Sequence, residues 1–389
     1  MGRLFSSESV TEGHPDKLCD KISDAVLDEF LRQDKYSRVA CESLASGNMV
    51  VVTGEITSDG KVDFDSIVRR VIRDIGYEDQ KNSIDWRTAD IKVYIKQQSE
   101  DIARGVIQEG EIGAGDQGTM FGYAVDETPE LMPMTISFAH KIVKELTNAR
   151  KSGKAPFLRP DGKSQVTIEY ENGKPKRVHT VVVSTQHAED ANMNDLREFV
   201  IEEIVKKIIP NEFLVNTKYF INPTGRFVIG GPLGDAGLTG RKVIVDTYGG
   251  HARHGGGAFS GKDPTKVDRS ANYMARRIAK TIVASKIAKK CEVCLTYVIG
   301  VADPVHLTID TFGTSKVPDG KIEKVATEIF KLKPKDIIEF LDLRKPIYEK
   351  TAAYGHFGRE NEGFKWEELN PAEIEIFASL KPKYKRKGV

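Results

Sequence analysis

One order of expected elements recurs three times along this chain of 389 residues, and it constrains the fold more than any single motif does. Each copy is a helix, two strands joined as a hairpin, and a second helix, repeated with a period of roughly 130 residues. No obvious residue identity links the copies, so the repeat lies in the pattern alone. The pattern predicts an α+β protein of three similar lobes in a pseudo-threefold arrangement, each a mixed sheet with helices on one face.

The bounds of these elements come from the spacing of apolar residues and from turn signals such as Asn172-Gly173. In the first copy we expect a helix over Pro15–Gln33, strands over Arg38–Ala45 and Met49–Thr57, and a helix over Phe64–Ile75. In the second we expect a helix over Met134–Arg150, strands over Ser164–Tyr170 and Arg177–Gln186, and a helix over Asn194–Ile208. In the third we expect a helix over Arg269–Lys289, strands over Cys291–Ile299 and Val305–Thr311, and a helix over Lys321–Phe330.

Long glycine-rich segments separate the copies, at Gln98–Gly122 and Pro223–Asp268. We expect an N-terminal lobe over 1–100, a central lobe over 113–230 and a C-terminal lobe over 231–370. Residues 371–389 form a tail that contains the basic run Lys381–Lys387. Long connections inside compact proteins tend to be functional, so both glycine-rich segments are candidate site regions.

The composition narrows the class of partner and the compartment. Lys and Arg number 58 and Asp and Glu 57, a net charge of +1, so we expect no chain-wide basic surface for nucleic acid. No apolar run approaches the roughly 18 residues of a membrane span. The four cysteines, Cys19, Cys41, Cys291 and Cys294, fit a reducing compartment. We therefore expect a cytoplasmic protein that binds neither nucleic acid nor membranes.

The segment from Gly230 to Asp268 carries the strongest chemical signal. Three glycine clusters alternate there with basic and acidic side chains, namely Arg241, Lys242, Arg253, Lys262, Lys266, Asp235, Asp246, Asp263 and Asp268. Backbone N–H groups beside glycine bind anions, basic residues add full charge, and aspartate can hold Mg²⁺. The segment predicts a site for metal-bound polyphosphate, although each cluster alone could be a turn with solvated charges. No Walker A sequence and no complete Rossmann fingerprint is present, so an ATP site would be of another kind.

A second phosphate signal lies at Glu12–Lys17, where Pro15 suits the first turn of a helix. The N-terminus of a helix attracts phosphate. His14 could therefore donate to a phosphate or leaving oxygen, and Asp16 could ligate Mg²⁺. The alternative is that both residues only cap the helix. The polar segment Ser99–Gly105 could close over a substrate as a lid, or be an ordinary surface loop.

Together these motifs closely resemble those of the S-adenosylmethionine synthetases, also called methionine adenosyltransferases. The motifs that carry the resemblance are GHPDK (Gly13–Lys17), ACE (Ala40–Glu42), GAGDQG with FGY (Gly113–Tyr123), RPDGKSQV (Arg159–Val166), VSTQH (Val183–His187), GGPLGDAGLTGRK (Gly230–Lys242), GGGAFSGKD (Gly256–Asp263) and AAYGHFGRE (Ala352–Glu360). The resemblance implies three similar lobes with interleaved chain, and a homodimer or dimer of dimers with active sites between subunits. It implies that methionine sulfur attacks C5′ of ATP and expels tripolyphosphate, which is hydrolysed to pyrophosphate and phosphate.

The resemblance also implies roles for individual residues. The catalytic set is His14, Lys163, Arg241, Lys242 and Lys262, and the ATP-binding set adds Asp161, Arg226, Phe227, Asp235 and Ala258. The methionine-binding set is Glu55, Gln98, Asp116, Asp235 and Lys266. Two Mg²⁺ ions would be held by Asp16 and Asp268, and K⁺ by Glu42. The family also has a mobile loop, which corresponds to Ser99–Gly110 in this sequence.

Two other functions fit parts of the sequence. A regulatory paralogue could bind nucleotide or polyphosphate without catalysis, but it should have lost metal carboxylates or lysines. Asp16, Asp268, Lys163 and Lys262 are all present, which argues against it. A phosphotransferase would fit the glycine and lysine pattern alone and would release ADP.

Overall fold

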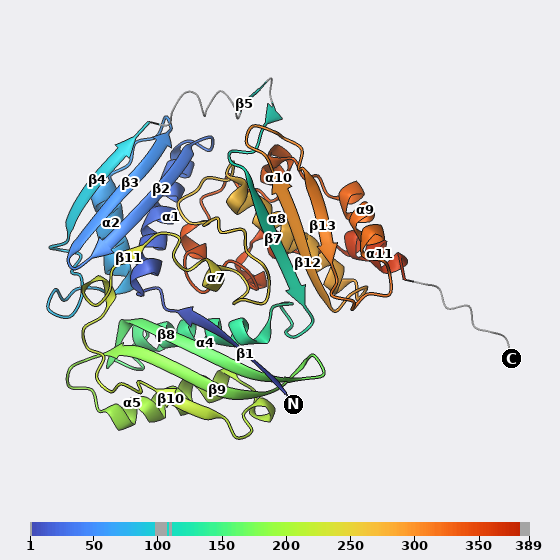
Figure 1. Ribbon diagram of the computed structural model, residues 1–389. Coiled ribbons are helices and arrows are strands. Elements are labelled where there is room, and N and C mark those ends of the chain that lie inside the picture. The colour runs from blue at the N-terminus through green and yellow to red at the C-terminus, as the bar shows by residue number, and fades with distance from the viewer. Residues whose placement is uncertain (1, 98–106, 109–110, 382–389) are drawn as a thin grey trace.

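The computed structural model describes residues 2–97, 107–108 and 111–381, and its three larger sheets are set around the middle of the molecule (Figure 1). The long first helix of each repeat packs against the strands of one sheet. These helices are α1 (Pro15–Gln33), α4 (Met134–Lys151) and α8 (Val267–Ala284). The prediction of an α+β protein with three similar lobes is confirmed.

The three sheets share one plan, built on an antiparallel hairpin. The hairpins are β2 (Arg38–Ser46) with β3 (Met49–Thr57), β8 (Leu158–Glu171) with β9 (Lys174–His187), and β12 (Lys290–Tyr297) with β13 (His306–Asp310). In two sheets a parallel strand lies beside the second hairpin strand: β4 (Asp90–Lys96) on β3, and β10 (Lys218–Ile221) on β9.

Each hairpin receives an antiparallel strand on its first member from a distant part of the sequence. These strands are β1 (Arg3–Val10) on β8, β7 (Gly118–Val125) on β12, and β11 (Gly237–Leu238) on β2. The pairing of β11 with β2 places β11, which lies just before Arg241, against the sheet that α1 covers. The glycine-rich segment is thereby held beside the first helix.

The remaining elements are shorter. They comprise α2 (Phe64–Ile75), β5 (Ile107–Gln108), β6 (Glu111–Ile112), α5 (Met193–Phe199), the π-helical turn η1 (Val200–Val205), α6 (Lys206–Ile208), α7 (Val243–Asp246), α9 (Asp319–Ile329), α10 (Pro334–Phe340), α11 (Pro371–Ser379), and the 3₁₀ turns η2 (Asn211–Phe213), η3 (Gly231–Leu233), η4 (Glu349–Thr351), η5 (Glu360–Glu362) and η6 (Lys365–Glu367). Among the described helices, none has the length and apolar character needed to cross a bilayer.

Most predicted elements are present, although the strand expected over Ser164–Tyr170 extends over Leu158–Glu171, and two helices differ for clear reasons. The helix expected over Arg269–Lys289 ends at Ala284, because Lys286 takes a left-handed backbone with φ of 58°. The helix expected over Asn194–Ile208 is interrupted by η1, whose hydrogen-bond pattern is wider than that of an α-helix. The apolar spacing is kept through this turn, with Val200, Ile204 and Val205 all buried.

Two hydrophobic cores hold the molecule together. One joins α1, α8 and the first and third sheets, and the other lies within the central lobe between α4 and the β8–β9 hairpin. The C-terminal segment closes the larger core, where Trp366 stacks on Tyr273 with ring centroids 3.9 Å apart.

Candidate active site

The N-terminus of α1 presents a neutral imidazole. His14 caps the helix, and its Nδ1 accepts a hydrogen bond of 3.2 Å from the Asp16 N–H, so the ring proton lies on Nε2. Burial and the charges of Lys242 and Lys163 lower the pKa of His14 to about 3. At neutral pH the Nε2–H is therefore a hydrogen-bond donor without a positive charge.

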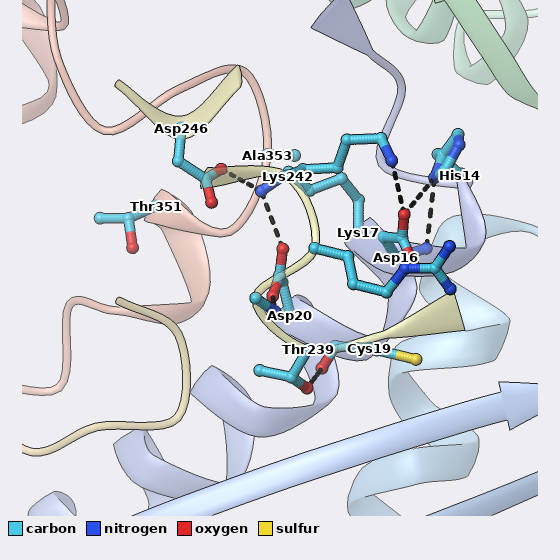
Figure 2. Close-up of polar contacts among 12 residues, drawn as sticks. His14, Asp16, Lys17, Cys19, Asp20, Thr239, Lys242, Asp246, Thr351 and Ala353 are labelled. Carbon is cyan, nitrogen blue, oxygen red and sulfur yellow. Dashed lines mark hydrogen bonds and ion pairs between the residues drawn. The ribbon is translucent and has the colours of Figure 1, made fainter. Parts of the chain in front are cut away.

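Asp16 lies at the centre of a group of cations (Figure 2). Its Oδ2 is 2.6 Å from Lys242 Nζ, its Oδ1 is 3.7 Å from Arg241 Nε, and the same Oδ1 accepts the Leu238 N–H at 3.0 Å. Burial alone would raise the pKa of Asp16, but the hydrogen bonds from Lys242 and Leu238 outweigh it and leave the pKa below its usual value. The carboxylate is thus ionised and available to a divalent cation.

Lys163 and Asp161 come to this group from the central lobe. Lys163 lies on β8 opposite Val10, with its side chain exposed, and its charge acts on both His14 and Asp161. Asp161 is buried and accepts the Gly231 N–H at 2.9 Å through one oxygen. Within the described part of the chain its other oxygen, Oδ1, has no hydrogen-bond partner, and burial raises its pKa to about 6.

A second cation–carboxylate pair lies at the start of α8. Lys262 Nζ is 2.6 Å from Asp268 Oδ2, and both side chains are only partly buried. A side chain at Gly257 would displace the Asp268 carboxylate, since a Cβ there would lie 2.0 Å from Asp268 Oδ1. Ala258 packs beside Gly240, where an added Cβ would lie 2.6 Å from the Ala258 Cβ. The loop that carries Lys262 therefore adjoins the one that carries Arg241 and Lys242.

The residues predicted to bind the substrate methionine are more widely separated. Asp116 is exposed and is brought toward Lys266 by the Gly115 N–H, which donates to the Thr265 carbonyl at 3.3 Å. Lys266 itself is paired with Asp263. Glu42 and Glu55 project from the open face of the first sheet, and Gln98 lies outside the described residues, as does Ser99–Gly105.

Several residues predicted to bind the nucleoside lie beside the central sheet. The Phe227 N–H donates to His187 Nε2 at 2.9 Å, which fixes the chain next to Arg226. The Arg226 side chain pairs with Glu189 at 3.0 Å, and the described contacts do not link it to the Asp16 group. Asp235 is exposed, and its charge acts on Asp161.

The carboxylates suit a metal that arrives with phosphate. The described residues contain no cluster of three or more His, Cys, Asp or Glu that would hold a metal on its own. Asp16 and Asp268 instead each stand among cations. Mg²⁺ is commonly bound through one or two carboxylates, water and substrate phosphates. The donor set therefore fits Mg²⁺ bridged to a polyphosphate.

Sequence models of one family match nearly the whole chain. They describe the N-terminal, central and C-terminal domains of S-adenosylmethionine synthetase, and match residues 2–100, 111–227 and 229–368. The chain is also 57% identical over 381 residues to the S-adenosylmethionine synthase of Desulfosudis oleivorans, with 96% of this chain and 98% of that protein covered. This chain belongs to the S-adenosylmethionine synthetase family. It is a methionine adenosyltransferase, an enzyme that synthesises S-adenosylmethionine.

This S-adenosylmethionine synthetase also contains site-forming residues that the sequence analysis did not single out. Asp20 and Asp24 lie on α1 behind Asp16, and each accepts a backbone N–H from a glycine-rich loop. Gln186 donates to the Val228 carbonyl at 2.9 Å, next to Phe227. The signal for the aspartates was available, because they follow Asp16 at intervals of four residues, which places them on one helix face.

Proposed function

We propose that this methionine adenosyltransferase works in two steps at the group formed by His14, Asp16, Lys163, Arg241 and Lys242. In the first step the methionine sulfur bonds to C5′ of ATP, and the C5′–O bond breaks with its electron pair leaving on tripolyphosphate. In the second step water cleaves the bound tripolyphosphate to pyrophosphate and phosphate. The observation that carries the proposal is the buried Asp16 carboxylate, set 2.6 Å from Lys242 and 3.7 Å from Arg241 beside a neutral His14.

The chemistry explains why the group is rich in cations. A thioether sulfur carries no proton, so its attack needs no general base. It needs alignment of sulfur with C5′ and stabilisation of a highly charged leaving group. Lys163, Arg241, Lys242 and Lys262 supply the charge, and the His14 Nε2–H donates to the oxygen that departs from C5′.

The two metal carboxylates act with these cations. Asp16 and Asp268 would each hold one Mg²⁺, which neutralises phosphate charge and orients the chain of phosphates. Lys242 and Lys262 neutralise the two carboxylates in the structure, and they would become free for phosphate oxygens if Mg²⁺ took over that role. Glu42 would hold K⁺ on the open face of the first sheet.

The Asp161 Oδ1 atom, which has no hydrogen-bond partner among the described residues, supports a nucleoside contact. A buried acceptor without a partner is costly, and a ribose hydroxyl or an adenine amino group would satisfy it. Arg226, Phe227, Asp235 and Ala258 complete the ATP-binding set, Asp235 being shared with methionine. The rest of the methionine set is Glu55, Gln98, Asp116 and Lys266.

We propose a homodimer or dimer of dimers in the cytoplasm, with the site completed by a partner subunit. Glu42, Thr53 and Tyr94 are neighbours across the open face of the first sheet, where Tyr94 is 63% exposed. Leu44 is 37% exposed on β2 two residues beyond Glu42, on that face. Exposed apolar side chains gathered on one face are typical of an interface, and Glu42 and Glu55 would be buried within it.

The reaction is tested by identifying products. The purified chain is incubated with ATP, L-methionine, Mg²⁺ and K⁺, and products are measured by mass spectrometry and phosphate assay. The proposal predicts S-adenosylmethionine with equal amounts of pyrophosphate and phosphate. ADP would contradict it in favour of phosphoryl transfer, and ATP binding without any product would favour the regulatory paralogue.

A further inference from the structure

Helix α1 carries four buried aspartates on one face. Asp16, Asp20, Asp24 and Asp28 recur every four residues and are between 0% and 2% exposed. Residues four apart on a helix lie one above the other. A buried carboxylate is costly unless its oxygens are paired. The partners of these four side chains therefore show what this face of the helix holds in place.

The second aspartate of the row holds the loop before Arg241. Asp20 Oδ1 accepts the Gly240 N–H at 2.9 Å, and Asp20 Oδ2 is 2.9 Å from Lys17 Nζ. Lys17 is fully buried, and its ammonium is also paired with Asp246, one helical turn beyond Lys242 (Figure 2). The segment that contains Arg241 and Lys242 is thus bound to α1 at both ends, through Gly240 and Asp246.

The third aspartate does the same for the loop before Lys262. Asp24 Oδ1 accepts the Gly261 N–H at 2.8 Å, and both Asp24 oxygens bind the Arg269 guanidinium, at 2.8 and 2.9 Å. Gly261 and Gly240 both have φ of 79°, a left-handed conformation that glycine adopts without strain. Each glycine stands one residue before a basic residue that we assign to the polyphosphate.

We propose that Asp20 and Asp24 are positioning residues that set the two basic loops of the polyphosphate site in register with His14 and Asp16. The inference rests on the proposed function, because it assumes that Arg241, Lys242 and Lys262 bind phosphate. Neither aspartate contacts a substrate in this account. Each fixes a backbone N–H and thereby the direction of the following side chain.

Asp28 provides a comparison on the same helix, with backbone N–H groups in place of the buried cations that pair with Asp20 and Asp24. It is equally buried, and it accepts the backbone N–H groups of Tyr348 and Glu349, both at 2.9 Å. These residues belong to neither basic loop. Replacing Asp28 by Asn therefore disturbs the row of aspartates without loosening Gly240 or Gly261.

The test compares Asp20→Asn, Asp24→Asn and Asp28→Asn with the wild-type enzyme, at a temperature where circular dichroism shows all four folded. Misplacing a charge by about 1 Å can cost on the order of 10²-fold in rate. We expect Asp20→Asn and Asp24→Asn to lower kcat by roughly 10- to 100-fold and to weaken binding of tripolyphosphate, with the KM for methionine within about threefold. Asp28→Asn should keep kcat within about threefold even if it melts earlier.

Lys242→Met in the same series separates this inference from the proposed function. An impaired Lys242→Met beside unimpaired Asp20→Asn and Asp24→Asn would overturn the positioning role alone. Equal losses of kcat in all three aspartate variants would also overturn it, because the row would then be only structural. An unimpaired, folded Lys242→Met would overturn the proposed function, and the positioning role with it.

A milder variant keeps the test open if Asp20→Asn does not fold. Thr239 precedes Gly240, and its hydroxyl accepts the Ser43 N–H at 2.9 Å and lies 2.9 Å from Ser23 Oγ on α1. Thr239→Val keeps the shape and removes these bonds. We expect kcat to fall about 3- to 10-fold with weaker tripolyphosphate binding. Unchanged kcat and unchanged binding in this folded variant would overturn the inference.

Discussion

Lys242 Nζ lies 2.6 Å from Asp16 Oδ2, although 226 positions separate the two residues in the sequence. The pair joins the first turn of α1 to the glycine-rich loop that follows β11. We propose that this is the resting arrangement, in which Lys242 pairs with the carboxylate that would hold Mg²⁺ once ATP binds. Two predictions about metal and nucleotide follow from the surroundings of this pair.

Replacing Asp16 with Asn should raise the requirement for Mg²⁺. The amide keeps the size of the side chain but is a weaker ligand, and Lys242 loses its partner. We expect kcat to fall by about 10²-fold and the half-saturating Mg²⁺ concentration to rise by about tenfold or more. The measurement is a Mg²⁺ titration of S-adenosylmethionine formation at fixed ATP. An unchanged Mg²⁺ dependence in the folded variant would remove Asp16 from the metal site.

Replacing Asp161 with Asn should act mainly on ATP binding. One oxygen of the buried carboxylate accepts the Gly231 N–H, and the other has no hydrogen-bond partner among the described residues, so we propose that it binds the nucleoside. A hydrogen bond to a charged group contributes about 1.5–3 kcal/mol, so we expect the KM for ATP to rise about 10- to 100-fold. The KM for methionine should stay within about threefold. A rise in both constants by the same factor would argue for a general loosening of the site instead.

His140 makes stability depend on pH. Its ring is buried, with Nδ1 2.7 Å from Ser9 Oγ, and burial together with the charges of Lys17 and Arg359 lowers its pKa to about 3. In the unfolded chain the pKa is about 6.5. The unfolded state therefore binds more protons between these values, and the contribution of neutral His140 to stability is complete above pH 6.5 and lost as the pH falls.

His140→Asn should reveal this effect by difference. The variant is expected to be less stable than the wild type at pH 7.5, because it loses the packing of the buried ring. The gap in unfolding free energy should narrow by up to about 1.4 kcal/mol for each pH unit below 6.5, since only the wild type loses this contribution. Urea denaturation at pH 7.5 and 5.5 measures the gap. A gap that does not change with pH would contradict the assignment.

The open face of the first sheet should govern assembly. Tyr94→Lys places a charge on that face, where we expect it to weaken the dimer by about tenfold or more. Tyr36 provides the control, since it is 60% exposed but lies in the turn between α1 and β2, where Lys35 and Arg344 lie over its ring. Light scattering across a concentration series should show dissociation for Tyr94→Lys and none for Tyr36→Lys. Identical association of both variants with that of the wild type would place the interface elsewhere.

Local signals predicted the helices and hairpins well. The bounds of α1, β3 and α2 agree with the sequence analysis. For α2 the signals are local, since Asp63 caps its start and Gly76 ends it in a left-handed conformation. The pairing of β1 with β8 joins Val10 to Lys163 and could not be predicted, since strand patterns carry no information about distant partners. The same limit applies to the loop contacts of Asp20 and Asp24.

For the site, the family resemblance indicated which residues to expect, and the structure showed which of them lie close together. The sequence placed His14 and Asp16 at a helix N-terminus, and the structure brings Lys163, Arg241 and Lys242 to them. Burial could not be anticipated for Lys17, which sits in the GHPDK motif but points away from Asp16 into the protein. The assigned roles of these residues stay predictions until variants are measured.

The most direct test of the central claim is the single-turnover rate of S-adenosylmethionine formation in Lys163→Met and Arg241→Leu, followed by rapid quench at saturating ATP, methionine and Mg²⁺. The control is Lys141→Met, an exposed lysine on α4 whose side chain is 48% exposed. If these cations stabilise the departing tripolyphosphate, the first two variants should form product about 10²- to 10³-fold more slowly, and the control at the wild-type rate. Folded Lys163→Met and Arg241→Leu enzymes that form product within about threefold of the wild-type rate would contradict the account.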